Sequence, residues 1–153
     1  MGSTNEPGGE VLPFVDEHSV LVAAPADAVW RALARQVAGF RSDGTAPLAH
    51  LLGAVPVRAA GTPLDEGATV PGFAVAEAAP GRYVRLTGRH RFSRYALLWT
   101  LTPQPGGTLL SARTEAAFPG PHGRAYRLLV ISSGAHRTMV RRMLRTVRRW
   151  AQG

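Results

Sequence analysis

The chain has 153 residues, which fits one domain with a single hydrophobic core. Its composition is globular, with 45% hydrophobic and 18% charged residues, and all 18 basic residues behind the net charge of +8 are arginines. Cysteine is absent, which excludes disulfides, thiol catalysis and cysteine-based metal sites. No apolar run approaches the roughly 20 residues that span a membrane, so we expect a soluble cytoplasmic protein.

The first third of the chain predicts a tail, a strand and two helices. Residues 1–12 are polar and rich in glycine, so we expect a loose tail, and they lack the basic start and apolar stretch of a signal peptide. Residues 14–23 are rich in β-branched side chains, which predicts the first strand. A helix is predicted over 25–38, where Asp27 suits the positive end of the helix dipole, and a second, short helix over 46–52.

The middle of the chain predicts an antiparallel sheet with one apolar face. Pairs of proline and glycine mark several of its turns. The predicted strands cover residues 55–59, 73–79, 83–91, 95–102 and 108–118. Alternation along each strand separates two faces. In the strand 83–91, Leu86 and His90 share the apolar face, while Arg85 and Arg89 lie on the other.

The last thirty residues predict one long amphipathic helix. Between residues 124 and 152 apolar side chains recur at helical spacing, and the opposite face is rich in arginine. Such a helix would be about 40 Å long, enough to cross a small domain. Gly134 lies within it and costs about 1 kcal/mol relative to alanine. We interpret this glycine as room for a ligand, a kink, or close packing of helix and sheet.

These elements together predict an α+β helix-grip fold. A curved antiparallel sheet is expected to wrap around the long C-terminal helix over 120–151. The two short helices that follow the first strand would close one end. We expect one domain over 13–152, with no internal repeat.

Three sequence features carry a family resemblance. The first strand is followed by Ala-Ala-Pro-Ala-Asp-Ala-Val-Trp-Arg-Ala-Leu over 23–33, and a hairpin sequence, Val-Ala-Glu-Ala-Ala-Pro-Gly-Arg, covers 75–82. The amphipathic C-terminal helix follows a last long strand. In these features the chain, over residues 14–151, resembles the START/Bet v1-like (SRPBCC) superfamily of polyketide cyclases/dehydrases and lipid-transport proteins.

The resemblance implies a cavity for an apolar ligand between the sheet and the long helix. The same fold serves carriers, receptors, cyclases and hydrolases, and the family has no universal catalytic residue to transfer. Our leading hypothesis is therefore a module that binds a hydrophobic or aromatic small molecule of polyketide or lipid type. The alternative is an enzyme of the cyclase/dehydratase type. No cofactor is expected in either case.

Eight residues are predicted to line this cavity and bind the ligand. They are Leu86, Leu97, Trp99, Thr114, Tyr126, Leu129, Ser133 and Val140. Aromatic walls with a polar tip suit a flat, partly oxygenated ligand. The competing interpretation of Trp99 is an ordinary aromatic core, and the hydroxyls of Thr114 and Ser133 are equally suited to local backbone groups.

His90, Tyr95 and His136 are the candidate catalytic residues. His90 and Tyr95 are on the apolar faces of their strands, and His136 is on the apolar stripe of the last helix. Imidazole titrates near neutral pH, so the two histidines could serve as general acid and base in a cyclisation or dehydration. The competing interpretation places His90 in solvent at the end of the sheet and gives His136 a structural hydrogen bond.

Other chemistries find little support in the sequence. His18, His50 and His122 are scattered and fit no metal-ligand spacing, so no metal site is predicted. The adjacent carboxylates Asp65 and Glu66 are interpreted as a solvated turn. No phosphate-binding loop, nucleophile elbow or HExxH motif is present.

A basic surface module is the remaining alternative. The basic run over 89–95 is interleaved with aromatic residues, a pattern typical of single-strand nucleic-acid binding. Against this, arginines on the last helix form the solvated face that any such helix needs, and they suit anionic lipid equally well. We therefore expect a hydrophobic small molecule as the partner, no nucleic acid, and at most peripheral membrane contact. Monomer and homodimer both stay open.

Overall fold

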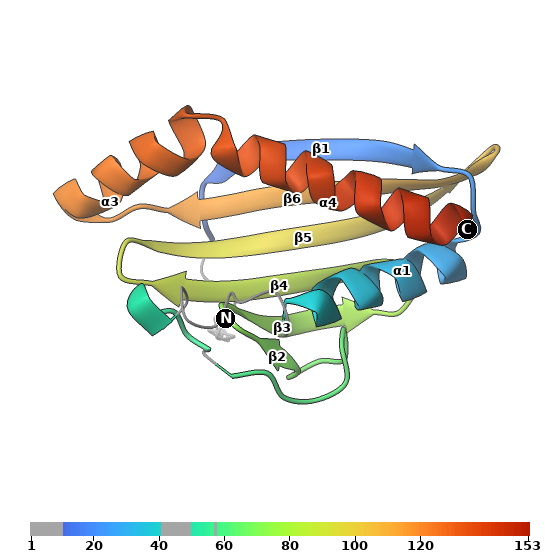
Figure 1. Cartoon of the computed structure of the whole chain (residues 1–153), viewed down its shortest axis with the longest axis horizontal. Helices are drawn as coiled ribbons and strands as arrows, with labels where there is room; N and C mark the ends of the chain where they lie inside the picture. Colours follow the sequence, from blue (N-terminus) through green and yellow to red (C-terminus); the bar gives the residue numbers. More distant parts are fainter. Residues whose placement is uncertain (1–10, 41–49, 57) are drawn as a thin grey trace, which may run out of the picture.

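The computed structural model describes residues 11–40, 50–56 and 58–153. One sheet is covered on one face by α4, which runs along it, and by α1 (Figure 1). The elements are, in chain order, β1 (Phe14–Val22), α1 (Ala26–Gly39), β2 (Thr69–Val70), β3 (Phe73–Ala79), β4 (Tyr83–His90), β5 (Ser93–Gln104), β6 (Gly107–Ala117), α3 (Gly120–Arg127), the π-helical turn η1 (Leu128–Ser132) and α4 (Ala135–Gln152).

The described strands form one antiparallel sheet in the order β1-β6-β5-β4-β3-β2. From β2 to β6 each strand is paired with the next one in sequence, and β1 pairs with β6, so that β1 and β2 are the two edge strands. The predicted α+β helix-grip fold is confirmed.

The C-terminal helix predicted over 120–151 is interrupted, and the interruption includes Gly134, for which a kink was one of the interpretations. The segment is divided into α3, η1 and α4, and Gly134 separates the last two. Gly134 has a φ of +82°, in the left-handed region that glycine enters without steric cost. In η1 the helix widens by one residue per turn, and the Ser133 hydroxyl donates to the Leu129 carbonyl at its end. The chain therefore changes direction before α4 begins.

Some smaller predictions also need correction. The described residues of the predicted strand over 55–59 form no strand, and Val55 makes an isolated bridge with Arg89. The short strand β2 was not predicted, and β5 begins at Ser93, two residues earlier than expected. Most of the predicted helix over 46–52 lies outside the described residues.

The packed core lies under α1 and the C-terminal half of α4. Trp99 of β5 is fully buried there. The fully or almost fully buried residues that α1 and α4 contribute to this core are Val29, Leu33, Val37, Val140, Leu144 and Val147. At the end of α4 the Arg35 guanidinium lies 4.2 Å from the centre of the Trp150 ring, and Gln152 accepts a hydrogen bond from the Ala23 N–H. None of the helices in the described part of the chain has the length and apolar character needed to span a bilayer.

Candidate functional site

A cavity of about 330 Å³ lies between the sheet and the segment formed by α3, η1 and the start of α4. Most of its lining is apolar or aromatic. The lining residues are Phe40, Pro71, Phe73, His90, Ser93, Tyr95, Ala96, Leu97, Thr114, Ala116, Phe118, Tyr126, Val130, Ile131, His136, Met139, Val140 and Met143. The cavity thus lies toward the N-terminal end of α4, next to the packed core, with which it shares Leu97, Val140 and Met143.

Strand alternation places the floor of this cavity. Leu97 of β5 is paired with Thr114 of β6, and Tyr95 is paired with Ala116, so these four side chains form two adjacent rows on the inner face. The break at Gly134 places α3 and η1 over the same end of the sheet, so the roof comes from α3, η1 and the first turns of α4.

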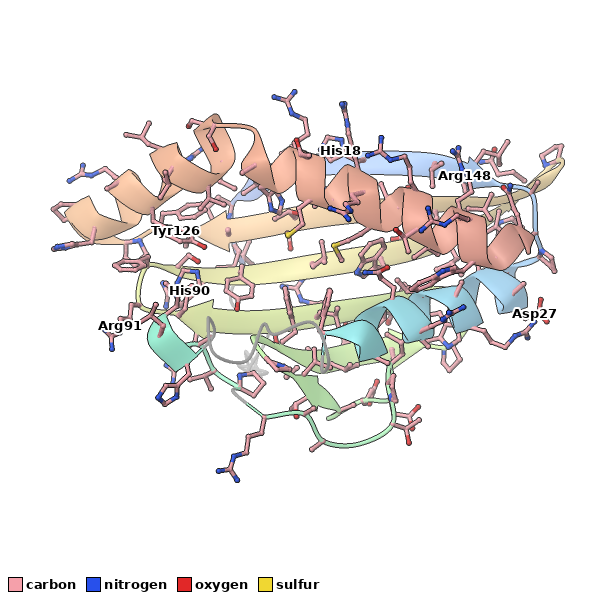
Figure 2. The ribbon with its side chains drawn as sticks, in the orientation of Figure 1. His18, Asp27, His90, Arg91, Tyr126 and Arg148 are labelled. Atoms are coloured by element: carbon pink, nitrogen blue, oxygen red, sulfur yellow. The ribbon has the colours of Figure 1, made fainter. Side chains whose placement is uncertain are left out.

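An aromatic wall closes the end of the cavity near the β4–β5 turn. The ring centre of Tyr126 on α3 lies 4.7 Å from that of His90 and 5.6 Å from that of Phe92. Figure 2 shows His90 and Tyr126 at the same end of the sheet. On the other side, the Tyr95 ring meets Phe73 edge-on at 5.2 Å. Such edge and stacked contacts hold the rings in fixed orientations.

Both ring nitrogens of His90 are bonded within its own turn. Nδ1 accepts a hydrogen bond from the backbone N–H of Phe92 at 3.0 Å, so the proton of the neutral ring is on Nε2, which lies 3.0 Å from the Ser93 hydroxyl. Burial lowers the pKa of His90, which favours this neutral form. His90 therefore locks the β4–β5 turn, and its nitrogens have no free lone pair to offer a ligand.

The hydroxyl of Tyr95 is likewise engaged. It donates to the carbonyl oxygen of Gly72 at 2.6 Å. Burial, with a smaller contribution from Tyr126, raises the pKa of Tyr95 to about 12, so the group stays protonated at neutral pH. The contact depends on Gly88, because a Cβ there would meet the Gly72 carbonyl and lie 2.8 Å from Cε2 of Tyr95.

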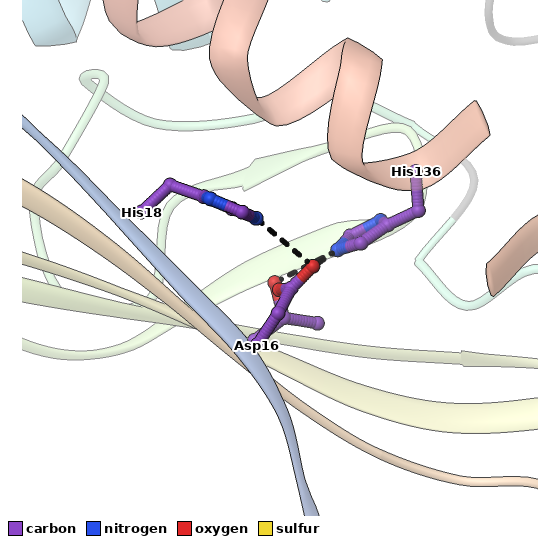
Figure 3. Close-up of polar contacts among 4 residues, drawn as sticks. Asp16, His18 and His136 are labelled. Carbon is purple, nitrogen blue, oxygen red and sulfur yellow. Dashed lines mark hydrogen bonds and ion pairs between the residues drawn. The ribbon is translucent and has the colours of Figure 1, made fainter. Parts of the chain in front are cut away.

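His136 belongs to a separate polar cluster on the other side of the cavity. Its Nε2 lies 3.0 Å from the hydroxyl of Thr114 and 3.5 Å from Oδ1 of Asp16. Oδ2 of the same carboxylate lies 3.2 Å from Nε2 of His18, so Asp16 stands between two imidazoles (Figure 3). Burial lowers the pKa of His136, and the Asp16 carboxylate opposes that shift.

A β-bulge in β1 lies directly before Asp16 and puts Phe14 and Asp16 on different faces of the sheet. Phe14 is paired with Glu115 on the outer face, yet Asp16 is paired with the inward-facing Thr114. Between these two pairs the register moves by two residues in β1 and by one in β6, so Val15 is the extra, bulged residue. Without the bulge, Phe14 and Asp16 would point to the same face.

Sequence reasoning missed Asp16 and His18. The signal that could have found them is their phase, because Asp16 and His18 alternate in step with Val20 and Val22, which is fully buried. In β1 every second residue from Asp16 onward therefore belongs to the inner face. Their contact with His136 depends on the fold, since more than 100 residues separate them along the chain.

The structure brings seven of the predicted site residues to the cavity. They are His90, Tyr95, Leu97, Thr114, Tyr126, His136 and Val140. The three candidate catalytic residues do not converge, however. His90 bonds to its own turn, Tyr95 to Gly72, and His136 to Thr114, and no hydrogen bond joins any two of the three.

Four predicted ligand-binding residues do not line the cavity. Trp99 and Leu86 have the expected inward orientation, but they lie further along the sheet and are buried within the packed core. Leu129 is 73% exposed, because the widened turn η1 rotates it to the outer surface. Ser133 is exposed at the same break.

A metal centre has no basis in the described residues. Among them, no group of three histidine, cysteine, aspartate or glutamate side chains could hold a metal ion, the Asp16 cluster included.

Comparisons with known proteins identify the fold. No family model and no curated protein matches the chain. An uncharacterised protein from Rhizobium leguminosarum has a similar structure, with a TM-score of 0.58 and 14% identity over 90% of this chain and 93% of its own. StfQ, a di-domain ARO/CYC protein from the steffimycin biosynthetic pathway, gives a TM-score of 0.50 and 17% identity over 92% of this chain and 51% of StfQ.

DynU16, from the dynemicin biosynthetic locus, is a third similar structure. Its TM-score is 0.51, with 18% identity over 84% of this chain and 45% of DynU16. At these identities the likeness shows a common fold, and it carries no information about a shared activity.

Proposed function

We propose that this chain is a START/Bet v1-like protein that binds a hydrophobic or aromatic small molecule, of polyketide or lipid type, in the cavity between the sheet and the α3–η1–α4 segment. The observation that carries the proposal is the cavity itself. Its volume of about 330 Å³ lies within the range of about 300–1,000 Å³ that is common for ligand sites. The likeness to StfQ and DynU16 adds support at the level of fold.

The lining indicates the chemistry of the ligand. Aromatic and aliphatic side chains make up most of it, and they offer flat surfaces to a planar or aliphatic molecule. An apolar cavity of about 150 Å³ holds one benzene, so this cavity has room for about two fused rings. Thr114 and His136 add polar atoms at one side, which suits a ligand with an oxygen at one edge.

The enzyme alternative retains one observation in its favour. His90 and Tyr95 already use their polar atoms in internal hydrogen bonds, so neither supports acid–base chemistry as they stand. His136 differs, because it lines the cavity and contacts a carboxylate. An acid–base role in a cyclase or dehydratase reaction would therefore centre on His136.

The test is to fill the cavity without disturbing the outer surface. Ala116 lines the cavity, and Ala117 follows it on the opposite face of β6. We expect wild-type protein to increase the fluorescence of N-phenyl-1-naphthylamine, and Ala116→Phe to weaken that binding at least about ten-fold, equal to about 1.4 kcal/mol. Ala117→Phe, the matched control, should bind as the wild type does. Equal binding by both variants, or none by the wild type, would contradict the proposal.

A further inference from the structure

We propose that Asp16, His18, Thr114 and His136 form an acid–base site in the cavity wall, which takes the acidic hydroxyl of a phenol or an enol. The inference rests on the proposed function, because it needs a ligand in the cavity. It adds two residues that the sequence did not indicate, and it names the polar group of the ligand.

The arrangement of hydrogen bonds around His136 is the first argument. The Nε2 edge of its ring faces Thr114 and the Asp16 carboxylate, at 3.0 and 3.5 Å. A carboxylate is an acceptor only, so it favours the tautomer with the proton on Nε2. That tautomer leaves a lone pair on Nδ1, which has no hydrogen-bond partner in the described part of the chain. A ring held at one nitrogen by a carboxylate is an oriented base at the other.

The way in which Asp16 is held is the second argument. His18 contacts one of its oxygens at 3.2 Å, and His136 lies near the other. The carboxylate side chain is only 23% exposed, and Oδ1 is buried without a full hydrogen bond in the described residues. A buried acceptor with unused bonding capacity is costly for stability alone. The same oxygen would become a strong partner once His136 carried a positive charge.

The position of Asp16 on β1 is the third argument. Asp16 alternates in step with Val20 and the fully buried Val22, so the regular part of β1 directs its carboxylate inward. The bulge at Val15 ends this alternation directly beside Asp16, and bulges occur preferentially beside functional sites. The structure thus positions a carboxylate beside a cavity that is otherwise mostly apolar.

The interaction follows from these positions. The ligand hydroxyl donates a hydrogen bond to the free Nδ1 of His136, while Nε2 of the same ring stays beside Thr114 and Asp16. Burial lowers the pKa of His136, so the ring is neutral and Nδ1 is an acceptor at neutral pH. When the proton moves to Nδ1, the ligand O–H bond breaks and an N–H bond forms. The ligand then becomes a phenolate or enolate, Asp16 stabilises the imidazolium, and His18 keeps the carboxylate in place. No other reactant is needed.

Two probes of similar shape separate this inference from the proposed function. Naphthalene tests the apolar cavity alone, and 2-naphthol adds one acidic hydroxyl. Because a hydrogen bond between neutral groups contributes a net of about 1 kcal/mol, wild-type protein should bind 2-naphthol about five-fold more tightly than naphthalene. The ratio should fall close to one in His136→Gln and decrease in Asp16→Asn and Thr114→Val. The ratio is taken within each variant, so that a change in naphthalene affinity itself cancels.

Matched controls come from exposed residues of the same types. His122 on α3 and Asp27 on α1 are both exposed, so His122→Gln and Asp27→Asn should keep the wild-type ratio. A second measurement is independent of variant folding: ¹⁵N NMR of the wild-type histidines should show the signal of the acceptor nitrogen Nδ1 of His136 shift when 2-naphthol binds, with a much smaller change when naphthalene binds.

The outcomes are distinguishable. Binding of both probes with a ratio near one in the wild type, or an unchanged neutral His136 signal in the 2-naphthol complex, overturns this inference and leaves the proposed function standing. Binding of neither probe overturns both.

Discussion

Individual polar residues in the cavity differ in how much bonding capacity the fold leaves them. His90 and Tyr95 are bonded to Ser93, Phe92 and Gly72, so they act as parts of the framework. His136 contacts Asp16 and Thr114 by one edge only. Proximity to the cavity is therefore a poor guide to chemistry, and the hydrogen bonds already made decide which side chain can act.

The two buried histidines predict a loss of stability in acid. Burial lowers the pKa of both His90 and His136 in the folded state, so the unfolded chain binds protons first. The free energy of unfolding should therefore fall as the pH drops below about 6.5, the ordinary pKa of histidine, and this contribution should be constant above about pH 7.5. Urea denaturation at pH 7.5 and 5.5 measures it. His136→Gln and His90→Gln should each lose less stability in acid than the wild type; equal losses would contradict the assignment.

A second residue-scale prediction concerns Gly88. A Cβ at this position would meet the Gly72 carbonyl and the Tyr95 ring, and the first of these is backbone that cannot easily move. Gly88→Ala should lower the free energy of unfolding by about 1–3 kcal/mol, because overpacking displaces the Tyr95 hydrogen bond. The control is Thr87→Ala, on the opposite face of β4. Thermal denaturation that finds the two variants equally stable would refute this account of the turn.

Single residues also mark where sequence reasoning stopped. Thr114, Tyr126 and Val140 could be placed at the cavity because alternation and helical spacing report which face a side chain occupies. The inward face of Asp16 follows from its alternation with Val20 and Val22, but nothing in a single sequence places it beside a histidine of the last helix. Its contact with His136 is a tertiary one.

At the scale of elements, the parts of the C-terminal segment before and after Gly134 have different surroundings. The part after the glycine, α4, packs on the core through Val140, Leu144 and Val147. The part before it, α3 and η1, exposes Leu128 and Leu129 and shares the roof of the cavity with the first turns of α4. The sequence predicted the apolar stripe and left a kink at Gly134 as one of three interpretations, because helical spacing continues on both sides of the glycine.

The break gives an element-scale prediction. Gly134 has a φ of +82°, and a Cβ added there would have only the end of the Arg137 side chain within 4 Å, at 3.8 Å. Gly134→Ala should therefore lower the free energy of unfolding by about 1–2 kcal/mol through backbone strain alone, and Gly134→Asn by less, since asparagine tolerates this conformation. A more stable Gly134→Ala variant, seen as a higher Tm, would show that the helix is continuous after all.

At the scale of the whole molecule, one sheet serves two purposes. Its inner face carries the fully buried Trp99 under α1 and α4, and two rows of residues from Leu97 to Ala116 floor the cavity at the other end. The fold class was predictable because turn signals bounded the strands and their order allowed only short connections. The extent of the cavity was not predictable. Leu86 and Trp99 face inward as Leu97 does, and which of the three reaches the cavity depends on the helix that lies above it.

The arginine-rich face of α4 is best understood at the same scale. Arg137, Arg141, Arg142 and Arg145 point to solvent on the side opposite the sheet. Such a face keeps a long amphipathic helix soluble on its outer side. We therefore interpret the charge of this face as a requirement for solubility, and the cavity as the feature that indicates function.

The central claim is that a ligand binds between the sheet and the start of α4, and methyl NMR tests it most directly. The chain has three methionines, two of which, Met139 and Met143, line the cavity. Titration of [¹³C-methyl]-methionine protein with naphthalene should shift both signals through the ring current of the bound molecule, and Ala116→Phe should abolish the shifts while Ala117→Phe retains them. Unchanged Met139 and Met143 signals in wild-type protein at saturating naphthalene would contradict the account.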